Sequence, residues 1–261
     1  MTVTVKLSKL YEYRMKIDWM VGGISTFIAV ASANILTYLI KVKREESRQV
    51  ADKILKPLYD DLKRITDIRY HRSPDELPEF RWGKIKEEKK YLHRKVPREL
   101  RKTIETFNEM YQRYSELRRA RLMDLKITSI VQRVGKDMGE SLSLVGGSGC
   151  KIYHERDPKN VRDFTIIDLL IEGKSVEQKI SEIHKMFTFK ENIKEEYYIE
   201  GTNGTGRMQK PHVNKAKFIK LFSEIEKRIA GDSELQNYLE QTRNVISEAE
   251  KLLKRIERKL A

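Results

Sequence analysis

The chain has 261 residues, a net charge of +14 and a pI near 9.6, and 35% of its side chains are charged. Its one cysteine excludes a framework of intrachain disulfides and any zinc site built from several cysteines. Hydrophobic residues still make up 39% of the chain, too many for a fully disordered protein, so we expect a folded body of one or two domains.

Residues 19–40 form a long apolar run of 22 positions without a charged side chain, after a polar N-terminal tail over residues 1–18. A helix of that length extends for about 33 Å and spans the roughly 30 Å hydrocarbon core of a bilayer. Trp19 and Tyr38 lie near its ends, where amphipathic rings favour the headgroup layer, and a basic cluster follows at residues 41–44. We therefore predict a single-pass transmembrane helix over residues 19–40.

Two alternatives to a retained span are a buried core helix and a cleaved signal peptide. A core helix rarely continues for so long without a charge. The triplet Ala31-Ser32-Ala33 fits a cleavage site, but apolar residues continue through Ile40, so we favour retention and leave cleavage open. Small residues at positions 25, 29 and 33 recur every fourth residue, a spacing that lets two such helices approach closely in a homodimer.

The membrane orientation depends on the charges on either side of this span. Four basic residues precede it and five follow it within about 15 residues, so the two flanks are nearly balanced. Residues 41–261 carry +12 of the net charge of +14. We expect a protein of the cell membrane with its N-terminus outside and residues 41–261 mostly in the cytoplasm.

Residues 41–70 are predicted to form a juxtamembrane helix that leaves the bilayer. Apolar residues recur every third or fourth position along one face: Val50, Ile54, Leu58, Leu62 and Ile65. Pro57 interrupts this pattern and predicts a kink or a fresh helical turn. Residues 71–96 contain two further prolines and are interpreted as a linker.

Residues 97–141 are predicted to form one long helix, because proline is absent after its first position. A helix of about 40 residues is ~60 Å long, as in a rod or a bundle strut. A short heptad seam extends from Leu100 to Tyr114, and the same register then reaches Arg118 and Arg121, where the seam changes phase.

Residues 142–213 are interpreted as a mixed, loop-rich region. The apolar run 164–171 fits either a strand or a helix, and residues 195–200 fit a strand or an arm. Ser175 and Gln178 have the spacing of a capping box, which predicts the start of a short helix.

Residues 214–261 are predicted to be helical, with a coiled-coil pattern at their end. Ser233 and Gln236 again have the spacing of a capping box. From Leu235 to Leu260 the apolar positions alternate four and three residues apart. Such a seam pairs with a second chain or closes a helical hairpin within one chain, and the sequence leaves both alternatives open.

Two short motifs resemble parts of a HAMP signalling linker. Residues 54–58 (ILKPL) look like its first helix, and residues 99–100 with 107–110 are similar to its second helix. The resemblance implies a compact parallel bundle that follows a membrane span. However, fifty residues separate Pro57 from Phe107, more than that bundle needs, so we assign the chain to no family.

Few residues have the spacing of a catalytic or binding site. The glycine-rich segment 144–151 does not complete the pattern of a phosphate-binding loop. The five histidines lack paired metal-ligand spacing, and Cys150 has no nucleophile context. The basic run 118–121 beside Tyr111 and Tyr114 gives weak support to nucleic-acid binding. We therefore predict no catalytic residue, no cofactor and no metal ligand.

The fold class expected from these patterns is mostly α. A single transmembrane helix is followed by an elongated helical bundle or coiled-coil body with a small mixed or loop-rich region. The predicted function is a non-enzymatic membrane tether or scaffold that acts through its basic body and binds protein partners through its heptad-patterned helices. One alternative is a membrane-tethered binder of anionic lipid or, less favoured, of nucleic acid. The other is a nucleotide-dependent protein that uses segment 144–151.

Overall fold

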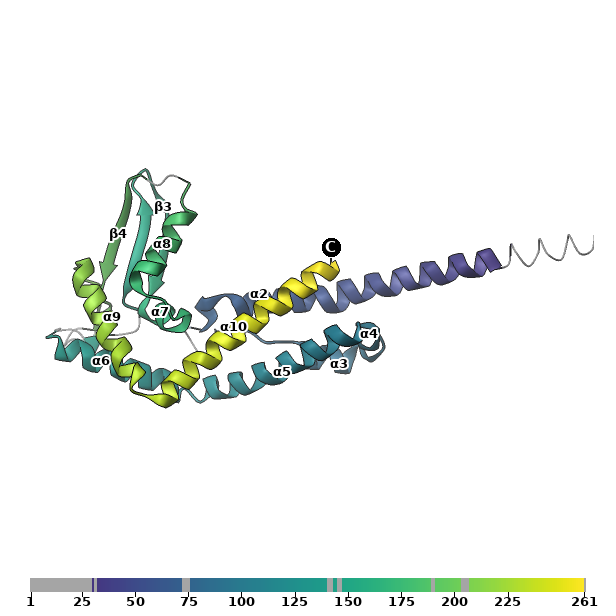
Figure 1. Cartoon of the computed structure of the whole chain (residues 1–261), viewed down its shortest axis with the longest axis horizontal. Helices are drawn as coiled ribbons and strands as arrows, with labels where there is room; N and C mark the ends of the chain where they lie inside the picture. Colours follow the sequence, from purple (N-terminus) through teal and green to yellow (C-terminus); the bar gives the residue numbers. More distant parts are fainter. Residues whose placement is uncertain are drawn as a thin grey trace, which may run out of the picture.

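The computed structural model describes residue 30 and residues 32–71, 76–139, 143–144, 147–188, 191–202 and 207–260. Within them the fold is mostly helical, with a small antiparallel sheet region. A long helix projects from one end of an elongated helical body, and the sheet unit stands at the other end (Figure 1). At this level the predicted mostly-α class is confirmed.

The helical elements, in chain order, are residues 32–50, the π-helix η1 (Ala51–Leu55), α2 (Lys56–Thr66), the 3-10 helix η2 (Ile68–His71), α3 (Trp82–Glu88), α4 (Lys90–Lys95), α5 (Arg98–Arg119), α6 (Leu122–Asp137), α7 (Ile166–Glu172), α8 (Val176–Met186), α9 (Lys215–Ala230) and α10 (Ser233–Leu260). The strands are β1 (Ser143–Leu144), β2 (Gly149–His154), β3 (Asp157–Thr165), β4 (Ile193–Tyr198), β5 (Gly201–Thr202), β6 (Met208–Gln209) and β7 (His212–Val213). They form two antiparallel sheets, in the orders β3-β2-β4-β7 and β1-β5-β6.

The predicted transmembrane span lies largely outside the described residues, as does the N-terminal tail, since positions 1–29 and 31 are not among them. Across the residues that are described, no helix is both long and apolar enough to cross a membrane. The predicted span is therefore not supported by the structure. Residues 32–40 are helical, and their large apolar side chains are exposed.

Pro57 lies in the first turn of α2, as the predicted fresh turn requires, and the π-helix η1 before it accommodates the proline without a break in the helix. A proline has no N–H for the carbonyl four residues earlier, which is that of Lys53, and its ring crowds that carbonyl. The helix widens over η1, where the Lys56 N–H donates to the carbonyl of Ala51, five residues back. The Lys53 carbonyl instead accepts a hydrogen bond from Lys89 Nζ at 3.0 Å. The helix thus passes directly into α2.

Residues 71–96 differ from the predicted linker, because α3 and α4 occupy much of this segment. The two helices have 7 and 6 residues, too few to show a clear helical period in the sequence. Burial stabilises them instead: Trp82 is 1% exposed, and its ring centroid lies 4.7 Å from that of His93. α3 also contacts α5.

The single long helix predicted over residues 97–141 is wrong, because the chain bends between α5 and α6. Arg121 adopts φ 55°, in the left-handed region that interrupts a right-handed helix. The bend lies where the heptad seam changes phase in the sequence. Arg118 is buried at this point, so the seam meets a buried charge rather than another apolar residue.

α10 is the central helix of the bundle and packs against α2 and α5 of the same chain (Figure 1). Its buried residues are Leu235, Tyr238, Leu239, Thr242, Val245, Ala249, Leu252 and Ile256. The heptad seam therefore closes an intramolecular bundle, which is one of the two predicted alternatives. The expected cap is displaced by one residue, since Asp232 Oδ1 accepts from the N–H groups of Glu234 and Leu235 at 3.2 Å each.

The region 142–213 is more regular than predicted, since β2, β3 and β4 form an antiparallel sheet within it. α9 covers one face of this sheet. The ring centroid of Phe218 in α9 lies 6.5 Å from that of Phe164 in β3 and 5.4 Å from that of Tyr197 in β4. Ile152 of β2 is also fully buried. The predicted strand near residues 195–200 is confirmed as β4.

Two capping boxes determine where the helices beside the sheet begin. The run 164–171 is both strand and helix, because β3 ends at Thr165, whose side chain caps α7 together with Asp168. The predicted box at Ser175 and Gln178 is confirmed, with both reciprocal hydrogen bonds at the start of α8.

Candidate functional site

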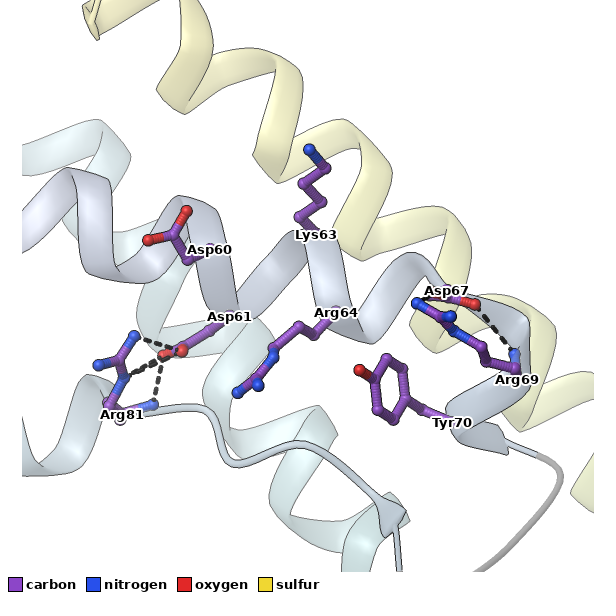
Figure 2. Close-up of a pocket in the computed structure, with 8 residues that line it drawn as sticks. All are labelled: Asp60, Asp61, Lys63, Arg64, Asp67, Arg69, Tyr70 and Arg81. Carbon is purple, nitrogen blue, oxygen red and sulfur yellow. Dashed lines mark hydrogen bonds and ion pairs between the residues drawn. The ribbon is translucent and has the colours of Figure 1, made fainter.

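A polar cleft of about 510 Å³ lies where α2 ends, η2 follows and the chain enters α3. Eight residues line it, and seven of them carry a charge: Asp60, Asp61, Lys63, Arg64, Asp67, Arg69, Tyr70 and Arg81 (Figure 2). Four of the charges are basic and three are acidic, so the cleft is almost neutral. What it can bind depends on which of these charges are already paired.

Asp61 and Arg81 form a multiple hydrogen-bonded ion pair on one side of the cleft. Asp61 is 3% exposed and accepts from Arg81 Nη2 at 2.6 Å, Nε at 2.9 Å and the backbone N–H at 3.1 Å. Arg81 Nη2 also donates to the carbonyl of Pro57 at 2.9 Å. The neighbouring carboxylate raises the pKa of Arg81. These contacts join the start of α3 to α2, so the pair is a structural clamp.

The opposite side of the cleft contains a second ion pair, between Arg69 and Asp67. The cationic side chain of Arg64 lies between the two ion pairs (Figure 2). Arg69 Nη2 lies 2.5 Å from Asp67 Oδ2. The Arg64 side chain extends into the cleft between Asp61 and Tyr70 (Figure 2). Within the described part of the chain Arg64 has no ion pair. An arginine beside an aromatic ring can hold a carboxylate or a phosphate. The carboxylates of both pairs are occupied by arginine, which leaves them poorly suited to proton transfer.

A buried polar network lies behind the cleft. In η2 the side chain of Tyr70 lines the cleft, whereas that of the next residue, His71, points into the core. His71 is fully buried, with Nε2 2.7 Å from the carbonyl of Ile65 and Nδ1 2.8 Å from Tyr114 Oη. A carbonyl only accepts, so Nε2 carries the proton and Nδ1 accepts from the tyrosine. Burial lowers the pKa of His71 to about 4 and raises that of Tyr114 to about 12. Both groups are therefore neutral at physiological pH.

Arg118 extends this network to the bend between α5 and α6. It is 2% exposed, and its Nη1 donates to Asp124 Oδ1 at 2.8 Å and to the Tyr238 hydroxyl. Its Nε and Nη2 have no hydrogen-bond partner among the described residues. Burial raises the pKa of Asp124. The arginine thus joins α5, α6 and α10, and Tyr111 and Tyr114 beside it are buried, so neither offers a stacking face to a base.

In the described part of segment 144–151, residue 144 lies in β1 and residues 149–151 lie in β2. A phosphate-binding loop leads into a helix, whereas residue 149 begins β2. A side chain at Gly149 would meet the carbonyl oxygen of Phe164 at 2.1 Å, so this glycine allows the close approach of β3. Lys151 Nζ lies 5.9 Å from the centroid of the Tyr198 ring. Burial raises the pKa of the Cys150 thiol to about 12, which leaves it unreactive.

The five histidines are on five separate elements: His71, His93, His154, His184 and His212. His184 is partly exposed, and its Nε2 lies 3.2 Å from Glu195 Oε1. Over the described ranges no three His, Cys, Asp or Glu side chains gather as a metal site.

The clamp and the buried network were not recognised in the sequence, although each has a signal there. Asp61 directly precedes Leu62 on the apolar face of α2, and Arg118 falls on the heptad seam of α5. A charge at a core position indicates a buried partner, but the sequence does not identify it. The chain matches no protein-family model, no curated protein and no solved structure.

Proposed function

We propose that the chain is a single-pass protein of the cell membrane and that its basic helical body acts as a non-enzymatic tether or scaffold. One observation carries this proposal. The helix of residues 32–50 projects from the body (Figure 1), and Ile35, Leu36, Leu39 and Ile40 on it are 44–61% exposed. Consecutive helical positions differ by about 100°, so these four side chains cover roughly 140° of the helix circumference. The exposed side chains of Val30, Tyr38 and Val42, which are 54%, 67% and 38% exposed, lie on the remaining sides, so apolar side chains surround the helix. Lipid is the environment that stabilises a helix apolar on all sides.

The charges that follow the span support an orientation with the body in the cytoplasm. Lys41, Lys43 and Arg44 are exposed at the point where the apolar residues end, and cytoplasmic flanks are enriched in such residues. The body that follows is an intramolecular bundle with a strongly charged surface, which suits contacts with other proteins. The homodimer predicted from the small-residue spacing rests on positions 25, 29 and 33, of which only the last is described.

Membrane fractionation with sodium carbonate tests the anchor, because carbonate releases peripheral proteins and leaves spanning ones in the pellet. We expect the wild-type chain in the pellet and a Val30→Asp/Leu36→Asp variant in the supernatant, since a charge near the centre of a span costs about 2.5–3.5 kcal/mol. A Lys102→Asp variant on the exposed face of α5 is the control and stays in the pellet. Release of the wild-type chain would overturn the proposal.

A further inference from the structure

A second cleft, the juxtamembrane groove, has a volume of about 740 Å³, within the range of sites that bind small ligands. One wall comes from residues 39–55 of the projecting helix and η1. The other wall comes from Lys95 at the end of α4, from Pro97 just before α5 and from Lys259 near the end of α10. The groove therefore lies at the end of the body from which the apolar helix departs.

The apolar lining of this groove continues the apolar surface of the helix. Val50 and Leu55 are 6% and 4% exposed and belong to the core of the body. Leu39 and Val42 are 56% and 38% exposed and lie at the end nearer the predicted span. An acyl chain beside Leu39 can thus contact the groove without leaving an apolar environment.

The charged lining is basic. It contains three lysines, Lys43, Lys95 and Lys259, and one glutamate, Glu46. Lys95 Nζ lies 3.0 Å from Glu46, whose carboxylate also accepts from the Tyr91 hydroxyl, and these contacts lower the pKa of Glu46. Lys43 and Lys259 have no ion pair with any residue that the structure describes. The groove therefore has two unneutralised ammonium groups beside an apolar wall.

We infer that the juxtamembrane groove binds one anionic phospholipid of the surrounding bilayer, with its phosphate between Lys43 and Lys259 and an acyl chain along Leu39 and Val42. The inference rests on the proposed membrane anchor. If the hydrocarbon core ends at Ile40, Lys43 lies about 4.5 Å farther along the helix. The headgroup layer is about 5–7 Å thick on each side, so Lys43 is at the depth of the phosphates.

Retention of lipid by the purified full-length chain tests this site. The protein in a mild neutral detergent is titrated with phosphatidylglycerol or phosphatidylcholine, and native mass spectrometry counts the bound lipids. Each basic residue at a membrane surface changes affinity about fivefold, so the two free lysines predict a preference of about 30-fold for the anionic lipid. The Lys43→Gln/Lys259→Gln variant loses this preference. Ser47→Trp fills the groove without changing its charge and reduces retention of both lipids.

A Lys185→Gln/Lys220→Gln variant is the matched control, with the same change of charge on exposed positions of α8 and α9. It keeps the preference for phosphatidylglycerol. An equal loss of this preference in both double variants, or no loss in either, would show that the groove is not the binding site.

Carbonate extraction of the same proteins separates the groove inference from the proposed membrane anchor. If the wild-type chain stays in the pellet but shows no lipid preference, only the groove inference fails. Release of the wild-type chain means that the anchor itself is wrong.

Discussion

The ion pair between Asp61 and Arg81 is the contact that holds the start of α3 against α2. Asp61→Asn removes the charge and one acceptor while Arg81 remains partly buried, with 43% of its side chain exposed. We expect the free energy of unfolding to fall by about 2 kcal/mol, measured by urea denaturation in mild detergent. Asp60→Asn makes the same change at the neighbouring exposed position and should cost less than ~0.5 kcal/mol. Equal effects would show that the pair is not a clamp.

His71 gives the fold a predictable dependence on pH. Its pKa is about 4 in the folded chain, below the ordinary value of 6.5, because burial disfavours the imidazolium. The unfolded chain therefore binds a proton between pH 6.5 and 4 while the folded chain does not, and stability falls as the pH is lowered through this range. By pH 4 this difference in proton binding lowers the free energy of unfolding by ~3 kcal/mol relative to pH 7.

The His71→Gln variant isolates this contribution from those of the other titrating groups. A glutamine amide can donate to the carbonyl of Ile65 and accept from the Tyr114 hydroxyl, but it does not titrate. The stability difference between wild type and variant, measured at pH 7.5, 5.5 and 4.5, should shift in favour of the variant as the pH falls. A constant difference would contradict the assignment of a buried neutral imidazole.

At the level of residues, the sequence identified caps better than it identified buried charges. The Ser175–Gln178 box follows from contacts three residues apart, so local spacing is sufficient to find it. Asp61 and Arg81 are twenty residues apart, and Arg118 meets Tyr238 across the bundle. Such pairings depend on the tertiary arrangement, which no local pattern contains.

α10 is the element on which the bundle depends. Leu239 is 4% exposed in the intramolecular seam, so Leu239→Asp places an unpaired carboxylate in the core. We expect a loss of at least ~4 kcal/mol and of the cooperative unfolding transition, followed by circular dichroism. Asn237→Asp, on the exposed face two residues earlier, should change stability by less than ~0.5 kcal/mol. A Leu239→Asp chain that stays folded but loses a crosslinked dimer would show that the seam is intermolecular.

The elements themselves were predictable where their apolar period was long. The seam of α10 and the apolar face of α2 extend over several turns, so burial follows from periodicity. α3 and α4 are too short for a period, and they fold because Trp82 is buried against His93. The bend at Arg121 is a backbone conformation, and the sequence shows it only as a change of phase.

For the whole molecule, the proposed orientation predicts which part a protease can reach. Lys41 and Arg44 follow the apolar residues and are exposed, and the body beyond them faces the cytoplasm in our proposal. Protease added to intact cells should therefore spare an epitope tag at the C-terminus and remove one at the N-terminus. Digestion of the C-terminal tag in intact cells, with the N-terminal tag spared, would reverse the orientation.

The environment of residue 36 in a bilayer distinguishes a membrane-spanning helix from a helix exposed to water. A spin label on Leu36→Cys is placed in vesicles, and its collisions with oxygen and with a water-soluble nickel chelate are compared. The native Cys150 is fully buried with a pKa near 12, so it does not compete for the label. A label on Lys102→Cys, at an exposed position of α5, gives the nickel accessibility of a site in water. In a spanning helix the label at residue 36 collides with oxygen and is shielded from nickel. Nickel accessibility equal to that at residue 102 would show that this part of the helix is in water.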